Sequence, residues 1–498
     1  MQNCNEKNFA ACLVARLGEA ACLIDAVTGQ TIPGRDLPRL IVGFAAGLRA
    51  VGLGPGDRVL VGCCVSPAST LAYLGAIYAG VVPVPAEERL LASSGDLLVA
   101  RSQAKAVWTD KPTDWDWAKK RAVRHIEGTF EACSQESLPP NPCVENDLAA
   151  LMPTSGSTGT PRLAMVSHGN LKSNTEAIIR SQRLGNDERA MLIMPVSYCF
   201  GASVMHTHLY QGGGVVFDSR FMFPDKVLHA IDTYGCTTFA GVPIIYNILL
   251  RRSNIRYIPL PNLRRFLQAG GALAPASIRE MCEIVPTTEF LVMYGQTEAT
   301  ARISCLPAAR LRDKLGSAGL PLDNLEIRIT DEEERELPHG QVGEIQVRGP
   351  SVCSGYLDDL ESTERKFQGG WLKTGDLACS DDEGYLWIKG RKDEFIKIRG
   401  LRVSVGEVET KVAAIAGISE CAAVGVQHPE AGEALALLVV PDKCVVGNAV
   451  AENREDDFRD MVLRALPPHW TCVSVKIVAE LPKTANGKIA RSQLQALL

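Results

Sequence analysis

Along most of its length, this chain alternates short runs of β-forming apolar residues with longer segments of helical character. The strand-like runs include DRVLVGCCV (57–65), RAMLIMPV (189–196), GGVVFD (213–218) and TTFAGVP (237–243). Strands that alternate with helices pair in parallel, because each helix returns the chain to the same edge of the sheet. The pattern therefore predicts an α/β architecture of parallel strands and covering helices.

Composition predicts a folded chain with several domains. Its 498 residues are 46% hydrophobic with a formal net charge of -5 and no long block of Lys or Arg, which argues against disorder and against a nucleic-acid surface. The longest apolar stretch, residues 69–86, contains Pro83 and Pro85. It predicts a buried helix and a buried strand rather than a membrane span, which needs about 20 apolar residues. The first residues lack the pattern of an export signal, so we expect a cytoplasmic protein.

The sixteen cysteines and the His206-x-His208 pair do not predict a metal site. No two cysteines have CxxC spacing, and Cys63 and Cys64 are adjacent. Without an export signal, most are best interpreted as small buried apolar residues. The histidine pair is best interpreted as packing or solvent-facing, because the sequence shows no partner ligands.

The character of the chain changes near residue 331. Residues 331–349 predict an acidic surface loop followed by a smaller antiparallel section. After residues 384–400, about a hundred residues have their own mixed helix and strand pattern. We place the boundary at 391–393, so that residues 1–390 form an N-terminal domain and residues 391–498 a C-terminal one.

The run TSGSTGTPR (154–162) has two interpretations. Backbone amides in a Gly/Ser/Thr turn can converge on phosphate oxygens, and Arg162 adds a fixed positive charge, yet a flexible linker would have the same glycines. The run follows the strand-like residues 145–153 and precedes the helix-like residues 167–182, and phosphate loops occupy such junctions. It lacks the G-x-x-x-x-G-K-[ST] pattern, which disfavours an ordinary P-loop NTPase.

MYGQTEATARIS (293–304) contains residue types that a nucleotide site needs. The ring of Tyr294 can stack on a purine, the hydroxyl of Thr297 can reach a phosphate and the carboxylate of Glu298 can hold Mg²⁺. Taken singly, a tyrosine such as Tyr294 is more often a core residue and a glutamate such as Glu298 more often lies on a solvated surface.

Two later segments offer a carboxylate and a cation. In WLKTGDLA (371–378), Asp376 is expected in a turn, where a carboxylate can accept both ribose hydroxyls. In LPKTANGKIAR (481–491), Lys488 follows an Asn-Gly pair that predicts a tight turn, from which its charge can enter a site. An ordinary turn aspartate and an exposed turn lysine are the alternatives.

Together these segments resemble the motifs of the adenylate-forming (AMP-binding) ligase superfamily. This superfamily includes acyl-CoA synthetases, stand-alone aminoacyl- or acyl-AMP ligases such as L-prolyl-AMP ligases, and adenylation domains of nonribosomal peptide synthetases. The motifs occur in the expected order from residue 154 to residue 491. The resemblance implies a large N-terminal domain of α/β layers with a small β-barrel-like section, and a small, mobile α+β C-terminal domain. It also implies that ATP and Mg²⁺ convert a carboxylic acid to an acyl-AMP, which then transfers to a thiol.

Residue by residue, the resemblance implies specific roles. Thr297 would contact the α-phosphate, Glu298 would hold Mg²⁺, and Lys488 would bridge the substrate carboxylate and the phosphate. Asp393 would be the domain hinge, and Gly400 would line the tunnel for a pantetheine thiol. Gly271, Ala272 and Tyr294 would flank the adenine, and Asp376 and Arg391 would bind the ribose. The loop around the phosphates would comprise Thr154, Ser155, Gly156, Ser157, Thr158, Gly159 and Arg162.

Two departures from the family pattern bear on the substrates. Arg162 stands where lysine is usual and Leu163 replaces a common glycine, and we expect ATP use to survive both. Amino-acid-activating domains have an F-D-x-S stretch whose aspartate binds the α-ammonium group. Here Gly201 takes its place, which puts a primary α-amino acid in doubt. By alignment, the residues expected near the acid are Tyr198, Gly201, Met205, Met293, Ala301 and Arg302.

The preferred hypothesis is a ligase that adenylates a small amino or imino acid such as L-proline for secondary-metabolite biosynthesis. The segment 395–409 resembles the carrier-docking segment of such enzymes. Only residues 489–498 follow Lys488, so we expect the thiol acceptor to be the phosphopantetheine of a separate peptidyl or acyl carrier protein. The alternative is an acyl-CoA synthetase or acyl-AMP ligase for a fatty or aryl acid, with CoA as acceptor. A nucleotide-binding regulator without turnover is disfavoured, because Glu298, Asp376 and Lys488 are all present.

Overall fold

The computed structural model describes residues 7–128 except 112, 114 and 122; 138–154; 161–392; 395–398; 401–428 except 414 and 416; 432–441; 455–467; 470; 472–483; and 489–498. The chain divides into two compact units. Unit 1 comprises Met1–Ile327 and Gln346–Lys373, and unit 2 comprises Arg328–Ile345 and Thr374–Leu498. The predicted boundary at 391–393 stays a prediction, since Asp393 lies outside the described residues.

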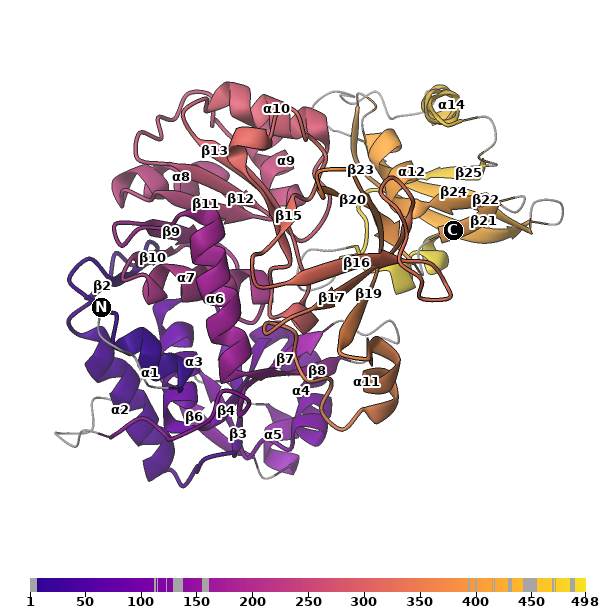
Figure 1. The fold of residues 1–498 in the computed structure, drawn as a ribbon. Coiled ribbons are helices and arrows are strands. Elements are labelled where there is room, and N and C mark those ends of the chain that lie inside the picture. The colour runs from indigo at the N-terminus through magenta and orange to yellow at the C-terminus, as the bar shows by residue number, and fades with distance from the viewer. Residues whose placement is uncertain are drawn as a thin grey trace. The chain divides into compact units, whose positions relative to one another are not determined.

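Unit 1 is built around a nine-stranded sheet with the order β15-β14-β13-β12-β11-β9-β10-β1-β2 (Figure 1). The strands from β13 to β1 in this order pair in parallel, and β2, β14 and β15 pair antiparallel at the edges. The predicted α/β architecture is therefore confirmed. The strands are β1 (Cys22–Asp25), β2 (Thr31–Pro33), β9 (Arg189–Leu192), β10 (Gly214–Phe217), β11 (Thr238–Gly241), β12 (Arg265–Gln268), β13 (Glu289–Tyr294), β14 (Ser304–Leu306) and β15 (Leu320–Pro321).

A second, four-stranded parallel sheet has the order β4-β3-β5-β6. Its strands are β3 (Arg58–Cys63), β4 (Val82–Glu87), β5 (Ala106–Thr109) and β6 (Arg124–Glu127). The long apolar stretch forms helix α3 (Pro67–Ala79) and then β4, both almost wholly buried, as predicted. Gly80 ends α3 in the left-handed conformation that favours glycine.

The run 154–162 joins two antiparallel strands, β7 (Leu148–Thr154) and β8 (Arg162–Ser167). The prediction that it lies at a strand-to-helix junction is wrong, because helix α6 (His168–Gln182) begins only after β8. Ser167 caps α6 in a reciprocal pair of hydrogen bonds with Asn170, which fixes where the helix starts. The preceding residues pair with β7 instead, and Leu163 is buried.

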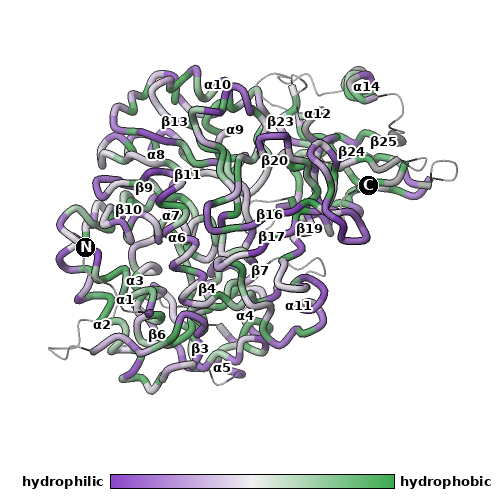
Figure 2. The backbone as a smooth tube through the Cα atoms, viewed as in Figure 1, coloured by the Kyte–Doolittle hydropathy of each residue, from purple (hydrophilic) through white to green (hydrophobic). Residues whose placement is uncertain are grey.

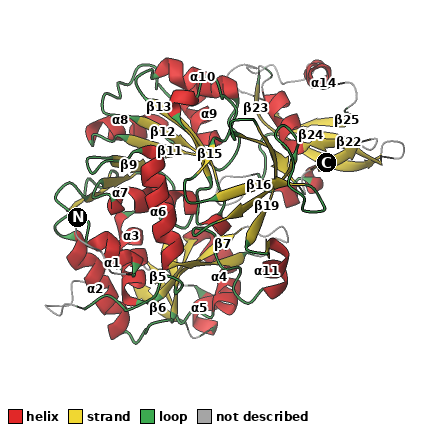
Figure 3. Cartoon of the chain, in the orientation of Figure 1, coloured by secondary structure: helices red, strands yellow, loops and turns green. Residues whose placement is uncertain are grey.

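Helices flank the strands of unit 1, and Figure 3 shows α8, α9 and α10 beside β11, β12 and β13. Proline occupies the first turn of α2, α3, α8, α9 and α10, where its missing N–H costs no hydrogen bond. None of the helices in the described part of the chain has the length and apolar character that a membrane crossing needs. The remaining helices of this unit are α1 (Phe9–Val14), α2 (Leu37–Ala50), α4 (Glu88–Ser102), α5 (Asp116–Lys120), α7 (Cys199–Tyr210), α8 (Pro224–Thr233), α9 (Pro243–Arg252), α10 (Pro275–Ile284), α11 (Leu360–Lys366) and the 3₁₀ turns η1 (Thr297–Ala299) and η2 (Ala308–Arg310).

Apolar side chains fill the space between the helices and the strands. Figure 2 shows hydrophobic residues along α3 and through the strands near α9, with hydrophilic residues gathered in the outer loops. Tyr246 of α9 packs its ring against Phe239, Phe266 and Phe290 of three neighbouring strands, and its hydroxyl donates to the Leu267 carbonyl (2.8 Å). The cysteines in the described part of the chain are free thiols, and those that are buried are Cys12, Cys22, Cys63, Cys236, Cys305, Cys353 and Cys421.

A five-stranded sheet has the order β16-β17-β19-β18, with β20 paired to β19. The pairs β18/β19 and β19/β20 are antiparallel, in agreement with the antiparallel section predicted after residue 331. The division of the chain into two units falls within β16, β17 and β19. The strands are β16 (Glu326–Thr330), β17 (Gly343–Arg348), β18 (Phe367–Gln368), β19 (Trp371–Ser380) and β20 (Leu386–Arg391).

Unit 2 has its own sheet and its own core. The sheet has the order β22-β21-β24-β23, with β25 paired in parallel to β24. Its core includes Ile396, Val408, Leu437, Val462 and Val475, which come from strands and helices of this unit. The elements are β21 (Phe395–Ile398), β22 (Leu401–Ser404), α12 (Val405–Ala413), β23 (Ile418–His428), β24 (Gly432–Pro441), α14 (Glu455–Ala465), β25 (Cys472–Ile477), η4 (Arg491–Gln493) and η5 (Gln495–Leu497).

Three histidines are buried in unit 1 as packing residues. His168 Nδ1 accepts from the Phe9 amide (3.1 Å), His206 lies against the rings of Phe9 and Tyr73, and His208 Nδ1 donates to the Val204 carbonyl (2.9 Å). Burial lowers the pKa of His168 and of His208 to about 4, and that of His206 to about 3. All three are therefore neutral at pH 7, and the described residues contain no cluster of ligating side chains that would hold a metal around them.

We predict that unit 1 loses stability as the pH falls from about 6.5 to about 4. The unfolded chain binds protons at histidine's ordinary pKa, whereas the folded chain does not, so each buried histidine contributes up to about 1.4 kcal/mol per pH unit. This stability is complete above pH 6.5 and is lost on acidification. Thermal unfolding between pH 4 and 8 should show a smaller slope for His206→Phe. His229→Gln, at an exposed site on α8, should keep the wild-type slope, and equal slopes for all three proteins would contradict the prediction.

Candidate active site

The turn after β13 holds Thr297 and Glu298 in a tightly constrained backbone. A Cβ atom at Gly295 would overlap the carbonyl oxygen of Ala301, so only glycine fits there. Thr300 (φ 63°) and Ala301 (φ 144°) both adopt positive φ values that non-glycine residues rarely adopt. Such strain persists only where the surrounding structure imposes it, and it is typical of functional sites.

Glu298 is buried and contacts two side chains from a distant segment. The Tyr356 hydroxyl donates to Oε1 at 2.5 Å, and the Lys366 ammonium lies 3.5 Å from the same oxygen. Burial raises the pKa of Glu298, but the charge of Lys366 and the Tyr356 hydrogen bond outweigh it, so the net shift is downward. Glu298 is therefore an ionised carboxylate in the protein interior and not a solvated surface residue. Sequence reasoning missed Tyr356 and Lys366, because neither lies in a recognisable motif.

Tyr356 also connects this carboxylate with Arg162. The Arg162 guanidinium lies 5.5 Å from the centroid of the Tyr356 ring, and its Nε is 3.3 Å from Asp359 Oδ2. Thr154 and Arg162 are cross-strand partners at the ends of β7 and β8. The loop residues from Ser155 to Thr160 lie outside the described residues. The structure thus brings the predicted loop cation and the predicted Mg²⁺ ligand into contact with the same tyrosine.

Two of the residues predicted to flank adenine follow Gly270, which lies against Tyr198. Gly271 and Ala272 are exposed after β12, and the Gly271 carbonyl accepts from Gln268 Nε2 (2.7 Å). At the neighbouring Gly270 (φ 84°), a Cβ atom would lie only 2.5 Å from the Tyr198 hydroxyl. Tyr198 is the residue immediately before α7. The third predicted adenine contact, Tyr294, is half-buried at the end of β13.

A small cavity lies beside Thr297. Its free space is narrow, about 10 Å³ for a water-sized sphere, and the Thr297 hydroxyl donates to Cys199 Sγ at 3.4 Å. Cys199, Ala202 and His206 contribute from one face of α7, at the i, i+3 and i+7 spacing that could have identified this face from sequence. Its lining residues are Tyr73, Met152, Val166, Leu171, Cys199, Ala202, His206, Thr297 and Thr300, which include none of the residues predicted for the acid pocket.

The predicted acid-pocket residues lie at the start of α7 and along it, on β13, and in the segment between η1 and β14. A Cβ atom at Gly201 would lie 2.6 Å from the Pro195 carbonyl oxygen, so an aspartate at this position would require the chain before α7 to move. Local packing therefore explains why position 201 is a glycine. The absence of an aspartate there is weaker evidence about which acid the protein binds. Met205 and Met293 are buried, and Arg302 is buried over the ring of Phe200.

In unit 2, the two predicted ribose contacts are neighbours. Asp376 and Arg391 are cross-strand partners on β19 and β20, with a 3.2 Å contact between Oδ1 and the guanidinium. The prediction that Asp376 lies in a turn is wrong, because β19 continues through it; the turn-like sequence reflects Gly375, whose φ of 77° is adopted within the strand. Asp393, Gly400 and Lys488 lie outside the described residues.

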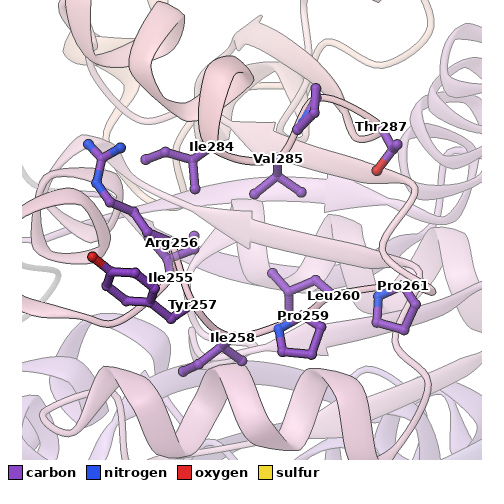
Figure 4. Close-up of a pocket in the computed structure, with 11 residues that line it drawn as sticks. Ile255, Arg256, Tyr257, Ile258, Pro259, Leu260, Pro261, Ile284, Val285 and Thr287 are labelled. Carbon is purple, nitrogen blue, oxygen red and sulfur yellow. The ribbon is translucent and has the colours of Figure 1, made fainter.

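A second hollow, formed by residues 255–261 and 284–287, lies at the surface of unit 1 (Figure 4). Its lining is mainly apolar, and Tyr257 is 82% exposed. Arg256 pairs with Glu280 at 2.5 Å. None of the predicted site residues lies in this hollow, so the turn at Thr297 and Glu298 remains the candidate site.

Family profiles match both parts of the chain. The profile described as AMP-binding enzyme matches residues 12–357, and the profile described as AMP-binding enzyme C-terminal domain matches residues 407–488. The chain belongs to the AMP-binding enzyme family. It is an AMP-forming, adenylate-forming ligase, and the predicted fold of a large N-terminal and a small C-terminal domain is confirmed.

Relatives of this ligase cover almost its whole length. Feruloyl-CoA synthase from an Amycolatopsis species is 32% identical over 474 residues, 94% of both chains. 4-Coumarate–CoA ligase 1 from Petroselinum crispum is 27% identical, with 97% of this chain and 92% of that protein covered. The ATP-bound structure of MatB from Rhodopseudomonas palustris matches with a TM-score of 0.87 at 28% identity over 99% of both chains.

We predict that Lys366→Met destabilises the ligase by about 3 kcal/mol, because it leaves the buried Glu298 carboxylate without its cation. Adding Glu298→Gln should recover part of this loss, since the remaining amide carries no charge. Urea unfolding of both single variants and the double variant measures the coupling. Arg310→Met, which breaks an exposed pair with Asp313, is the control and should cost far less stability than Lys366→Met. Strictly additive losses for Lys366→Met and Glu298→Gln would contradict this assignment.

Proposed function

We propose that this ligase converts a carboxylic acid and ATP to an acyl-AMP and pyrophosphate, and then transfers the acyl group to the thiol of CoA with release of AMP. The observation that carries the proposal is the strained turn that sets Thr297 beside a cavity and Glu298, ionised, in the interior. Two relatives that span nearly the whole chain are named as CoA-thioester-forming enzymes, which supports CoA as the acceptor.

The chemistry requires alignment of two negatively charged groups. The substrate carboxylate is already ionised at neutral pH, so it needs no general base. It must be brought to the α-phosphate while charge develops on that phosphate and pyrophosphate departs. We assign Thr297 to the α-phosphate, and Lys488, from its place in the sequence motif, to the bridge between carboxylate and phosphate.

We assign the Mg²⁺ site to Glu298. Magnesium is usually held by one or two carboxylates together with phosphate oxygens of the substrate. A buried carboxylate with a lowered pKa fits that requirement, and the described residues offer no larger cluster of ligating side chains. When bound, the ion would neutralise phosphate charge during nucleotide binding and turnover.

The remaining assignments follow the motifs. The loop from Thr154 to Arg162 would hold the phosphates, and Gly271, Ala272 and Tyr294 would flank the adenine. Asp376 would accept both ribose hydroxyls, with Arg391 holding its carboxylate in place through their 3.2 Å contact. The acid would lie against α7, near the residues named from the alignment.

Thioester formation needs Lys488 to withdraw from the site and the thiol to enter. We propose that residues 391–498 rotate about Asp393 between the two half-reactions, with Gly400 lining the thiol path. Residues 1–390 would stay fixed around the acyl-AMP.

A second candidate is loading of a small amino or imino acid such as L-proline onto a separate carrier protein. The segment 395–409 favours it, because its sequence resembles carrier-docking segments. A secondary amine could be held without an aspartate at position 201, where the structure leaves no room for one.

Exchange of labelled pyrophosphate into ATP with a panel of acids tests both candidates. We expect acid-dependent exchange, followed by a CoA thioester detected by mass spectrometry when CoA is added. Exchange with L-proline and transfer only to a carrier protein would support the second candidate. Nucleotide binding without exchange for any acid would indicate a regulator and contradict both.

We predict that Lys488→Ala lowers pyrophosphate exchange by about 100-fold or more, because charge stabilisation in the transition state is lost. Thioester formation from supplied acyl-AMP should keep most of its rate, since Lys488 would be withdrawn in that step. Lys483→Ala, a nearby lysine paired with Glu420, is the control and should leave both steps unchanged. Equal loss of both steps in Lys488→Ala would contradict the two-conformation scheme.

A further inference from the structure

Arg302 is one of the most deeply buried large side chains of the chain, with 2% exposure. Its backbone is held on both sides by Asn174, whose amide nitrogen donates to the Arg302 carbonyl (2.8 Å) and whose oxygen accepts from the Arg302 amide (3.3 Å). Asn174 is itself buried on α6. The backbone from which the Arg302 side chain extends is therefore held in place within unit 1.

No carboxylate of a described residue contacts the Arg302 guanidinium. Its neighbours are the ring of Phe200, whose centroid lies 5.1 Å from the guanidinium carbon, and the sulfur of Met293. Arg265, another buried arginine, has the carboxylate partner that a buried guanidinium usually has, because it pairs with Glu188 at 2.6 Å. A buried cation without an anion is costly, so one expects a partner that the protein chain itself does not supply.

The Cys305 thiol and the Tyr198 phenol, which lie near Arg302, are neutral at pH 7. Burial lowers the pKa of Arg302 to about 10, against the influence of Cys305, Cys199 and Tyr198. Burial also raises the pKa of Cys305 to about 11 and raises that of Tyr198 above its ordinary value. Arg302 is therefore charged while the thiol of Cys305 and the phenol of Tyr198 are not.

The beginning of α7 adds further positive potential at the same place. Tyr198, the residue that caps this twelve-residue helix, makes no side-chain cap hydrogen bond, and Phe200 is in its first turn. The first turn of a helix carries partial positive charge that favours anions. Cys199 Sγ accepts a hydrogen bond from the Thr297 hydroxyl, and the Arg302 guanidinium lies over the Phe200 ring, so this first turn contacts both Arg302 and the residue assigned to the α-phosphate.

We propose that Arg302 and the first turn of α7 form an anion subsite in the acid pocket, and that the substrate is a small dicarboxylic acid. The inference rests on the proposed function. One carboxylate of the acid is adenylated near Thr297, and the other pairs with Arg302. The pairing supplies the anion that the buried guanidinium lacks, so an acid with a methyl group in place of the second carboxylate binds poorly.

Two matched pairs of acids test the subsite: succinate against butyrate, and terephthalate against 4-methylbenzoate. In pyrophosphate exchange, the wild type should prefer at least one dicarboxylate over its partner by about 100-fold in kcat/KM, the range expected for a buried charge pair. Arg302→Met should abolish this preference by lowering kcat/KM for the dicarboxylate about 100-fold. Arg302→Lys, which keeps the charge, should retain part of the preference.

Thermal unfolding separates this role from a structural one. Arg302→Met should raise the Tm of the ligand-free protein, because it removes an uncompensated buried charge. Succinate or terephthalate alone should raise the Tm of the wild type and not that of the variant. Arg265→Met, which breaks a buried pair, should lower the Tm without changing the ratio between the acids, and the exposed Arg183→Met should change neither.

The outcomes distinguish the subsite from the proposed function. Exchange with monocarboxylates but not with their dicarboxylate partners overturns the subsite and leaves the proposed function intact. Equal losses for both kinds of acid in Arg302→Met also overturn it, because Arg302 would then hold the reacting carboxylate. If no acid supports exchange, but dicarboxylates raise the Tm of the wild type alone, the subsite stands and the proposed function fails. Absence of both effects overturns both.

Discussion

The buried carboxylate of Glu298 is the interaction on which the arrangement of the site in unit 1 depends. It joins the turn after β13 to Tyr356 and Lys366, and through Tyr356 it is connected to Arg162 on the neighbouring hairpin. Three segments that are far apart in sequence are thereby fixed around one negative charge. Since a buried ion must be compensated, the position of each segment constrains the others.

Much of the fold could be predicted from the sequence, because its signals are local. Alternating strand-like and helix-like runs indicated the parallel sheets, and the apolar stretch at 69–86 formed the expected helix and strand. The β7–β8 hairpin was missed because residues 162–166 were left without an assignment before the helical pattern. Asp376 was placed in a turn because Gly375 looks like turn sequence, although the strand continues through its positive φ.

The site residues that belong to a sequence motif could be predicted, whereas those brought to the site only by packing of the folded chain could not. Thr297 and Glu298 follow from the motif, whereas Tyr356 and Lys366 become visible only once the chain is folded around them. The substrate side shows the same limit. Gly201 appeared to report a missing ammonium partner, but its lack of a side chain has a packing reason. In the sequence, Arg302 was one of several residues aligned with the acid pocket. Its burial without an acidic partner among the described residues, which only the structure shows, singles it out as the residue proposed to bind the substrate.

The buried cysteines have a consequence for an enzyme that handles thiols. Burial raises the pKa of Cys236 and of Cys353 to about 12, and it also raises the pKa of Cys63 and Cys421. Protonated, inaccessible thiols attack disulfides slowly. These side chains can therefore fill the interior as apolar groups without forming mixed disulfides with an oxidised acceptor. The buried cysteines are thus shielded from the thiol that the ligase is proposed to acylate.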